Sequence, residues 1–390
     1  MVKEISGDVD HIMAAFRAAM ARIRLAPSTG PHGMTTHAVL TELEPEALAS
    51  ALAALDAPGF HARQIYQWIY RRGITDFARM TDLSGDLRAR LDDTFTIPTP
   101  DVVARHDSTD GAVKFQLRFD DGREVETVFI PDTPAMTFCV STQVGCAMQC
   151  GFCLTGRMGL LRNLTAGEIA AQVRLMAHAL DLAGRRFNIV LMGMGEPLHN
   201  YDATMKALRI LAADCGLAVH PRRVTLSTVG VLPALERLAH EPLMPNLAVS
   251  LHATTEAQRD RLVPVNRAYG LADLIAACRR FPTKRRDRIT FEYVLLQGVN
   301  DSVADARRLG RLLHGIRSKV NVIPLNEAPG IPYRRPTDAE VDRFARTLAG
   351  RGVTVSVRKS RGRDIRAACG QLIVGGTRPS AGQRAAALLP

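Results

Sequence analysis

The chain has 390 residues, of which 46% are hydrophobic, and its 50 lysines and arginines against 39 aspartates and glutamates give a formal net charge of +11. This length and apolar content suffice for one large domain with a smaller companion. The basic balance suits a polyanionic partner, although charge alone does not separate RNA binding from DNA binding or from ordinary solubility. No apolar run reaches the length of a membrane span and no cleavable signal pattern is present, so we predict a cytoplasmic protein with no membrane partner.

The first hundred residues divide into an extension and a small helical domain. Residues 1–40 begin with a stretch rich in Ala, Arg, Pro and Gly, and we expect this extension to be disordered. A helix is predicted to begin near Pro45, because proline is favoured in the first turn. Apolar residues at helical spacing then run through 41–100, which we interpret as an N-terminal helical accessory domain. These residues are Ile65, Trp68, Ile69, Leu83, Leu87 and Leu91.

Residues 101–135 are predicted to form a β-hairpin connector, because the alternating runs 113–119 and 124–130 flank a turn sequence, Asp120-Asp-Gly122. Over 136–330, six apolar runs typical of strands alternate with helical stretches. This alternation predicts an α/β fold whose parallel sheet curls into a partial (β/α)6 barrel. The six runs are 136–143, 188–194, 222–228, 246–252, 289–297 and 320–325.

The C-terminal part, 331–377, is predicted to contain a helix and a strand followed by a loop that carries Cys369. The helix would open with a capping box, Thr337-Asp-Ala-Glu340, and the strand would cover 353–357. We expect the last residues, 378–390, to be a flexible tail.

Basic residues cluster at 284–288 and at 358–363, and Arg366 follows the second cluster shortly before Cys369. A solvated charged surface explains the first cluster as well as contact with a polyanion does.

Three cysteines, Cys146, Cys150 and Cys153, follow the first of the six runs. This CxxxCxxC spacing lets three thiolates hold three irons of a 4Fe–4S cluster and leaves the fourth iron free to chelate S-adenosylmethionine (SAM), as in the radical-SAM superfamily. The alternative is a structural zinc site with Cys139 as the fourth ligand. We favour the cluster, because no second CxxC or HxxxH pair follows the motif. The odd number of cysteines, seven, also fits metal-binding or catalytic thiols better than a disulfide framework.

Polar residues stand where the other strand-like runs end. Gly195-Glu196 follows the second run, Ser227 closes the third, Ser250-Leu251-His252 closes the fourth, and Asn326 follows the sixth. In a parallel barrel the carboxyl ends of the strands meet at one rim, where active sites form. Each residue alone could belong to a turn, but their register with the cysteine loop predicts one common site.

With these motifs together, the chain resembles the RlmN/Cfr family of radical-SAM RNA methyltransferases. The resemblance covers roughly residues 41–377, and the combination of Cys139 with Ala367-Ala-Cys-Gly370 is specific to this family. The other matching segments are 125–131, 139–153, 162–165, 193–197, 250–253, 324–326 and 357–371.

The resemblance implies a role for each candidate residue. The three motif cysteines would ligate the cluster, Cys369 would carry the methyl group, and Glu126 would accept a proton. Cys139 would be the second catalytic thiol, which forms a disulfide with Cys369 and so frees the product. Two SAM molecules would be used in each turnover, one to methylate Cys369 and one to start the radical reaction. The implied SAM-binding residues are Gly195, Glu196, Ser227, Ser250, Leu251, His252 and Asn326.

The family also implies the substrates. They would be carbon 2 of an adenosine in the peptidyl-transferase region of 23S rRNA and the adenosine beside the tRNA anticodon, with an electron donor such as flavodoxin and a monomeric enzyme. Two alternatives stay open at this point. A Cfr-type enzyme would methylate carbon 8 with the same thiols, and a zinc-stabilised RNA-binding protein would have no activity.

The surroundings of the cysteines suggest how their reactivity differs. We expect Arg361, Arg363 and Arg366 to lower the pKa of Cys369, since nearby cations favour the thiolate. Cys215 and Cys278 lie in helical stretches and are expected to be small buried apolar residues.

Overall fold

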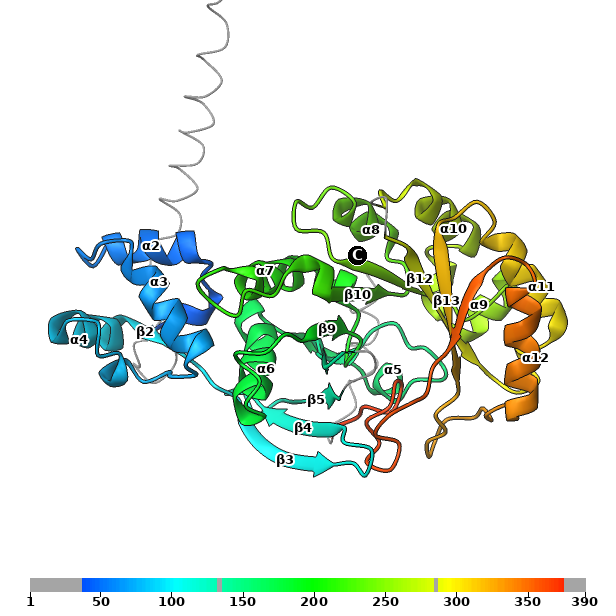
Figure 1. The fold of residues 1–390 in the computed structure, drawn as a ribbon, viewed down its shortest axis with the longest axis horizontal. Coiled ribbons are helices and arrows are strands. Elements are labelled where there is room, and N and C mark those ends of the chain that lie inside the picture. The colour runs from blue at the N-terminus through cyan, green and yellow to red at the C-terminus, as the bar shows by residue number, and fades with distance from the viewer. Residues whose placement is uncertain (1–36, 132–134, 284–286, 375–390) are drawn as a thin grey trace, which may run out of the picture.

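The computed structural model describes residues 37–131, 135–283 and 287–374. A large twisted sheet with helices against it forms the main body, and a small helical domain lies at one end (Figure 1). The predicted extension up to residue 36, the predicted tail 378–390 and residues 284–286 of the first basic cluster lie outside the described residues. Within the described ranges, no helix has the length and apolar character needed to cross a membrane.

The N-terminal helices, blue in Figure 1, are held together by the apolar residues that the sequence singled out. Pro45 occupies the first turn of α2, and Ile65 and Leu91 are fully buried. A short parallel pair, β1 with β2, joins the two ends of this region. The elements are β1 (Ala38–Val39), η1 (Leu40–Glu42), α2 (Pro45–Ala53), α3 (His61–Tyr66), the π-helical turn η2 (Gln67–Arg71), η3 (Phe77–Arg79), α4 (Gly85–Thr94) and β2 (Phe95–Thr96).

The predicted α/β partial barrel is confirmed. The main sheet has the order β14-β13-β12-β11-β10-β9-β6-β5-β4-β3, and every neighbouring pair from β6 to β14 is parallel. Since β14 pairs with β13, the strand predicted near the C-terminus is part of the barrel sheet. The parallel strands are β6 (Thr137–Cys139), β9 (Asn188–Leu191), β10 (Val224–Thr228), β11 (Asn246–Ser250), β12 (Ile289–Leu295), β13 (Ser318–Pro324) and β14 (Thr354–Val357).

The predicted hairpin is present, and it extends the barrel sheet rather than standing apart from it. β4 (Val113–Arg118) pairs antiparallel with β5 (Glu124–Ile130), and β5 pairs antiparallel with β6. A further strand, β3 (Asp101–Asp107), covers the free edge of β4. The alternating pattern did not predict β3, because six of its seven residues are exposed and the seventh is half-buried.

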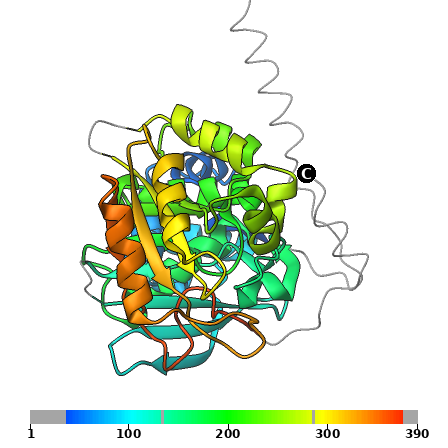
Figure 2. The ribbon, with the colours of Figure 1, turned by 90° about the vertical axis from the view of Figure 1, so that its right-hand side faces the viewer.

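Helices link successive parallel strands and cover the sheet, with α11 and α12 on the outside of its last strands (Figure 2). The predicted capping box of Thr337 with Glu340 is formed, and a second one, Thr165 with Glu168, opens α6. The helices are α6 (Ala166–Ala179), α7 (Tyr201–Ala212), α8 (Leu232–Leu238), α9 (Glu256–Leu262), α10 (Leu271–Arg280), α11 (Val303–Leu312) and α12 (Asp338–Ala349), with 3-10 turns η4 (Pro197–Asn200), η5 (Pro221–Arg223) and η6 (Pro264–Arg267).

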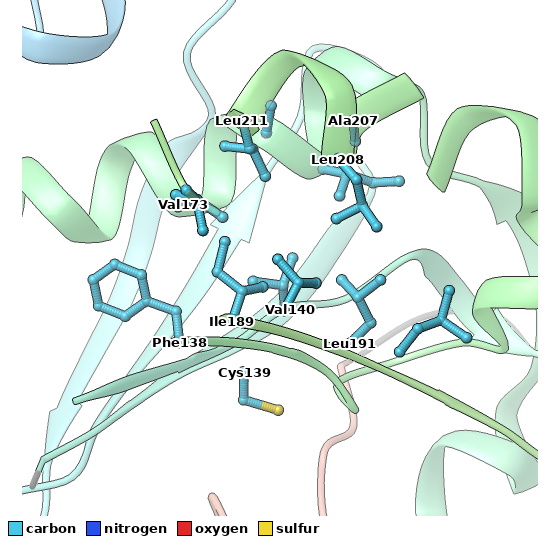
Figure 3. Packing of buried hydrophobic residues seen from close by; sticks show 14 of the residues in the cluster. Phe138, Cys139, Val140, Val173, Ile189, Leu191, Ala207, Leu208 and Leu211 are labelled. Atoms are coloured by element: carbon cyan, nitrogen blue, oxygen red, sulfur yellow. The ribbon is translucent and has the colours of Figure 1, made fainter. Parts of the chain in front are cut away.

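The run predicted as one strand, 136–143, divides into two. β6 ends at Cys139, while β7 (Gln143–Cys146) pairs with β8 (Gly159–Asn163) in a separate ribbon. Side chains alternate along β6 as the period of a strand requires. In Figure 3, Phe138 and Val140 point toward the helices, whereas Cys139 points to the other face of the strand. The candidate second thiol therefore faces away from the core that α6 and α7 cover.

Candidate active site

The cysteine motif leaves the sheet and forms a buried loop. Cys146 is the last residue of β7, and Cys153 is the N-cap residue of α5 (Leu154–Met158). Cys146 and Cys150 are each 9% exposed, and burial raises the pKa of all three thiols. Thiols in such surroundings stay protonated until a metal displaces their protons. Without a metal, buried thiols of raised pKa are poor nucleophiles.

One cavity joins this loop to the carboxyl ends of the parallel strands. The three motif cysteines line it together with Cys369, and so do six of the seven residues predicted to bind SAM. These six are Gly195, Glu196, Ser227, Ser250, His252 and Asn326. The seventh, Leu251, is fully buried in the main apolar core, and its backbone N–H donates to the Glu292 carbonyl at 3.1 Å.

Within the part of the chain that the structure describes, two polar atoms in the cavity wall have no hydrogen-bond partner. They are Oε2 of Glu292 and Oδ1 of Asn326, and each residue is only 4% exposed. A buried polar atom without a hydrogen bond is costly, so such atoms mark places where a ligand or water completes the site. Three buried thiols beside free acceptors fit a 4Fe–4S cluster with SAM, whose amino group is a donor.

Glu196 and His252 are both held by backbone groups. The Glu196 carboxylate accepts hydrogen bonds from the N–H groups of Leu198 and Val229 at 3.1 and 3.0 Å, while burial raises its pKa to about 7. Nδ1 of His252 accepts from the Val294 N–H at 3.0 Å, and burial lowers the pKa of this ring to about 3. His252 is therefore neutral at physiological pH, with its proton on Nε2.

The two candidate catalytic thiols lie close enough to influence each other. Burial raises the pKa of Cys139 to about 12, the Cys369 thiol adds to this rise, and Arg358 opposes it. Both thiols are free rather than joined in a disulfide. The arginine that lines the cavity is Arg358, whereas Arg363 and Arg366, two of the three expected to act on Cys369, are exposed to solvent.

Glu126, the candidate proton acceptor, does not line this cavity. It lies on β5, where Oε1 is 2.7 Å from Nζ of Lys114 on β4, and the side chains are 5% and 8% exposed. Its other oxygen, Oε2, accepts a hydrogen bond from the Ile373 N–H at 2.8 Å. Glu126 thus connects the antiparallel end of the sheet to the chain that follows Cys369.

The chain around Cys369, residues 358–374, is fastened to several elements. Asp110 accepts from the Gly362 N–H at 2.9 Å, and Asp364 accepts from the Ser108 hydroxyl at 2.6 Å. Asn326 donates to the Cys369 carbonyl at 3.2 Å. We refer to residues 358–374 as the Cys369 segment. Its contacts hold Cys369 at the cavity.

Sequence reasoning missed two charged residues of this region, Lys114 and Glu292, and it named Arg358 only as part of the second basic cluster. Glu292 stands in the middle of β12, whose seven residues are all buried, and Lys114 stands in a strand with only one exposed residue. A charged residue inside an otherwise apolar strand is unusual unless it has a partner, and that signal was available in the sequence.

The described residues do not provide the ligands that the alternative, a structural zinc site, would need. Among the residues that the structure describes, no three His, Cys, Asp or Glu side chains are grouped so that they could hold one metal ion. Cys139, the fourth ligand that this alternative needs, is not among the residues that line the cavity with the cysteine loop.

Comparisons with known proteins agree with this geometry. The Radical SAM superfamily matches residues 140–309, and a family described as ribosomal RNA large subunit methyltransferase N-terminal domain matches residues 39–97. A crystal structure of a radical SAM methyltransferase from Sphaerobacter thermophilus superposes with a TM-score of 0.82 at 48% identity, covering 86% of this chain and 99% of that one. The cysteine loop, the cavity and the partial barrel thus define a radical-SAM enzyme, for which a 4Fe–4S cluster and SAM are the cofactors.

Relatives of similar sequence identify the family within the radical-SAM enzymes. A dual-specificity RNA methyltransferase RlmN from Anaeromyxobacter dehalogenans is 49% identical over 90% of this chain and 95% of its own length. Another of the same name, from Geobacter sulfurreducens, is 52% identical over 80% of this chain and 86% of its own length. The chain belongs to the RlmN family.

Proposed function

We propose that this enzyme methylates carbon 2 of adenosine in two RNAs, the peptidyl-transferase region of 23S rRNA and the tRNA position beside the anticodon. The relatives are named dual-specificity RNA methyltransferases, which supports two RNA substrates. The observation that carries the proposal is the shared cavity, because Cys369 lines it together with Cys146, Cys150 and Cys153. A methyl carrier has to lie beside the groups that load it.

The protein side of the reaction follows from the positions of the two thiols. When bound, SAM would supply a methyl group to a thiolate, and the cluster together with SAM would supply the one-electron chemistry that activates this methyl group. Cys369 would receive the methyl group and present it to adenine, and Arg358 lies in the same cavity wall. Glu126 would take the ring proton. Cys139 would then form a disulfide with Cys369, which breaks the bond between sulfur and the new carbon.

Binding of SAM would use the rim of the barrel. Glu196, Asn326 and Glu292 offer oxygen acceptors, and Ser227 and Ser250 offer hydroxyl groups whose oxygens are 3.3 Å apart. His252, as a neutral ring with the proton on Nε2, can donate one hydrogen bond. We also propose that the enzyme is a cytoplasmic monomer and that an electron donor such as flavodoxin reduces it.

Mass spectrometry of nucleosides tests the proposal. Ribosomal RNA and tRNA from a deletion strain should lack 2-methyladenosine, and the purified enzyme should restore it to both RNAs. Formation of 8-methyladenosine instead would assign the chain to the Cfr type of chemistry. If the enzyme restores 2-methyladenosine to only one of the two RNAs, the other RNA is not a substrate.

A further inference from the structure

Helix α9 packs its C-terminal end directly on the cysteine loop. The Gly151 N–H, between Cys150 and Cys153, donates to the Leu262 carbonyl at 3.0 Å. A Cβ atom at Gly151 would lie 3.8 Å from the Arg261 carbonyl. The loop and the helix therefore approach each other backbone to backbone, and the side chains of α9 on this side lie near the cysteines.

Besides Leu262, the buried side chain of α9 is that of Arg259. It is fully buried, and it is the largest of the fully buried side chains in the described part of the molecule. Its guanidinium donates to three backbone carbonyls, those of Val229, Ser250 and Leu251. These carbonyls lie at or just after the carboxyl ends of β10 and β11, so Arg259 braces the rim that lines the cavity.

The positive charge of Arg259 lacks a direct carboxylate partner. Its Nη1 donates to Oδ1 of Asn266 at 2.9 Å, and Asn266 in turn donates to Glu256 and Asp260 at 2.8 and 2.7 Å. Among the described residues, no ion pair within 4.0 Å includes Arg259. Neutral carbonyls satisfy its hydrogen bonds, but they do not neutralise its charge, and a buried charge of this kind is costly unless an anion lies nearby.

The anion that this environment implies is on the cysteine loop. Burial lowers the pKa of Arg259 to about 10, and the groups that oppose this fall are, largest first, Cys150 on the cysteine loop and Glu256 on α9. Arg259 therefore stays protonated at neutral pH. Three thiolates and the cluster they hold carry net negative charge, and each electron added to the cluster increases it. Net charge and hydrogen bonding around a cluster are among the factors that set its reduction potential.

We propose that Arg259 is the buried counter-charge of the iron–sulfur cluster, stabilising its reduced form more than its oxidised form while holding the carbonyls of the SAM-binding rim in place. Arg259 is a positioning residue and not a metal ligand. The inference rests on the proposed ligation of the cluster by Cys146, Cys150 and Cys153.

The test compares reduction potentials of purified, anaerobically reconstituted protein without SAM or RNA. Arg259→Gln keeps amide donors for the carbonyls but removes the charge, whereas Arg259→Lys keeps the charge. Arg261→Gln is the matched control, because it removes an exposed positive charge from the same helix. Iron content is measured first, and the midpoint potential then follows from a redox titration read by electron paramagnetic resonance.

We expect a more negative midpoint potential for Arg259→Gln, and values close to wild type for Arg259→Lys and Arg261→Gln. Arg259→Gln with wild-type iron and wild-type potential would overturn the inference. If Arg259→Gln takes up no iron, the Arg259→Lys variant is the deciding one. Wild-type iron content and midpoint potential in Arg259→Lys support the inference, and loss of iron from this variant overturns it. A wild-type protein that binds no iron would instead defeat the proposed cluster site, so the two failures are distinguishable.

Discussion

Replacing Lys114 by Met should destabilise the enzyme and shift the pH dependence of methyl transfer. Met has a similar length and no charge, so it fills the space and removes only the partner of Glu126. The 2.7 Å pair between Lys114 and Glu126 lies in a region where the side chains are 8% and 5% exposed. Removing one partner of such a pair leaves an uncompensated buried carboxylate.

The expected decrease in the free energy of unfolding follows from the burial of this ion pair. Breaking a buried ion pair costs about 3–5 kcal/mol, and the cost falls where the remaining carboxyl group takes up a proton instead. The double variant Lys114→Met with Glu126→Gln should recover most of this loss, because it leaves no charge and Gln can still accept the hydrogen bond from Ile373. Lys319→Met, at an exposed position of β13, should stay within about 0.5 kcal/mol of wild type.

The pH dependence has a definite sign. Burial raises the pKa of Glu126, and Lys114 opposes this rise, so the pKa should be higher still in Lys114→Met. A proton acceptor works as the carboxylate, and activity therefore rises with pH through this pKa; the rising limb should move to higher pH in the variant. Because the folded-state pKa is raised above the unfolded value, the contribution of Glu126 to stability is present at low pH and is lost as pH rises through the folded-state pKa.

Two measurements check this reasoning: urea denaturation at several pH values, and single-turnover methyl transfer to RNA as a function of pH. Lys114→Met with a wild-type urea midpoint would show that the pair contributes nothing to stability. A rising limb at the wild-type pH would show that Lys114 does not act on the proton acceptor, or that Glu126 is not that acceptor. Glu126→Gln distinguishes these two cases, since it should abolish the limb only if Glu126 is the base.

Three further predictions concern the cysteines. Replacing Cys146, Cys150 or Cys153 by Ala should abolish both iron binding and activity, because the cluster loses a covalent anchor; wild-type iron content in any of these variants would contradict the ligand assignment. Cys139→Ala should retain iron and accumulate a covalent protein–RNA adduct visible on denaturing gels, whereas normal turnover would make Cys139 a structural thiol. Cys369→Ala should retain iron but transfer no methyl group, and peptide mapping of active wild-type enzyme should find a methylated thiol at Cys369 alone; surviving transfer would exclude the carrier mechanism.

The barrel could be predicted from the sequence because its central strands, such as β12, are buried on both faces and read as largely apolar runs. When parallel strands are in order, their carboxyl ends meet at one rim. The positions of site residues such as Ser227 and Asn326, which stand at those ends, can then be predicted as well. The division of the first run was not predictable in this way. The chain at 140–142 still bonds to Val190 and Met194 while it leaves the regular ladder, so its composition resembles that of a continuous strand.

The charged network around the site depends on contacts that periodicity does not encode. Arg358 follows the last strand, and Glu292 stands four strands from Cys139 in the order of the sheet, yet the sheet curls so that Arg358 acts on both. The sequence placed the basic cluster near Cys369 correctly along the chain. Only the path of the Cys369 segment selects Arg358 rather than Arg363 or Arg366 as the arginine that lines the cavity.

The pair of Lys114 and Glu126 marks where sequence reasoning stops. The turn at Asp120-Asp-Gly122 sets the register of its hairpin, so that Gln116 lies opposite Glu126. Lys114 is two residues further along β4, which makes it a diagonal neighbour of Glu126 on the same face of the sheet. The turn alone therefore puts both charges on one face. The turn does not predict that the Cys369 segment covers this face of the sheet. The pair of Lys114 and Glu126 is buried because of that cover.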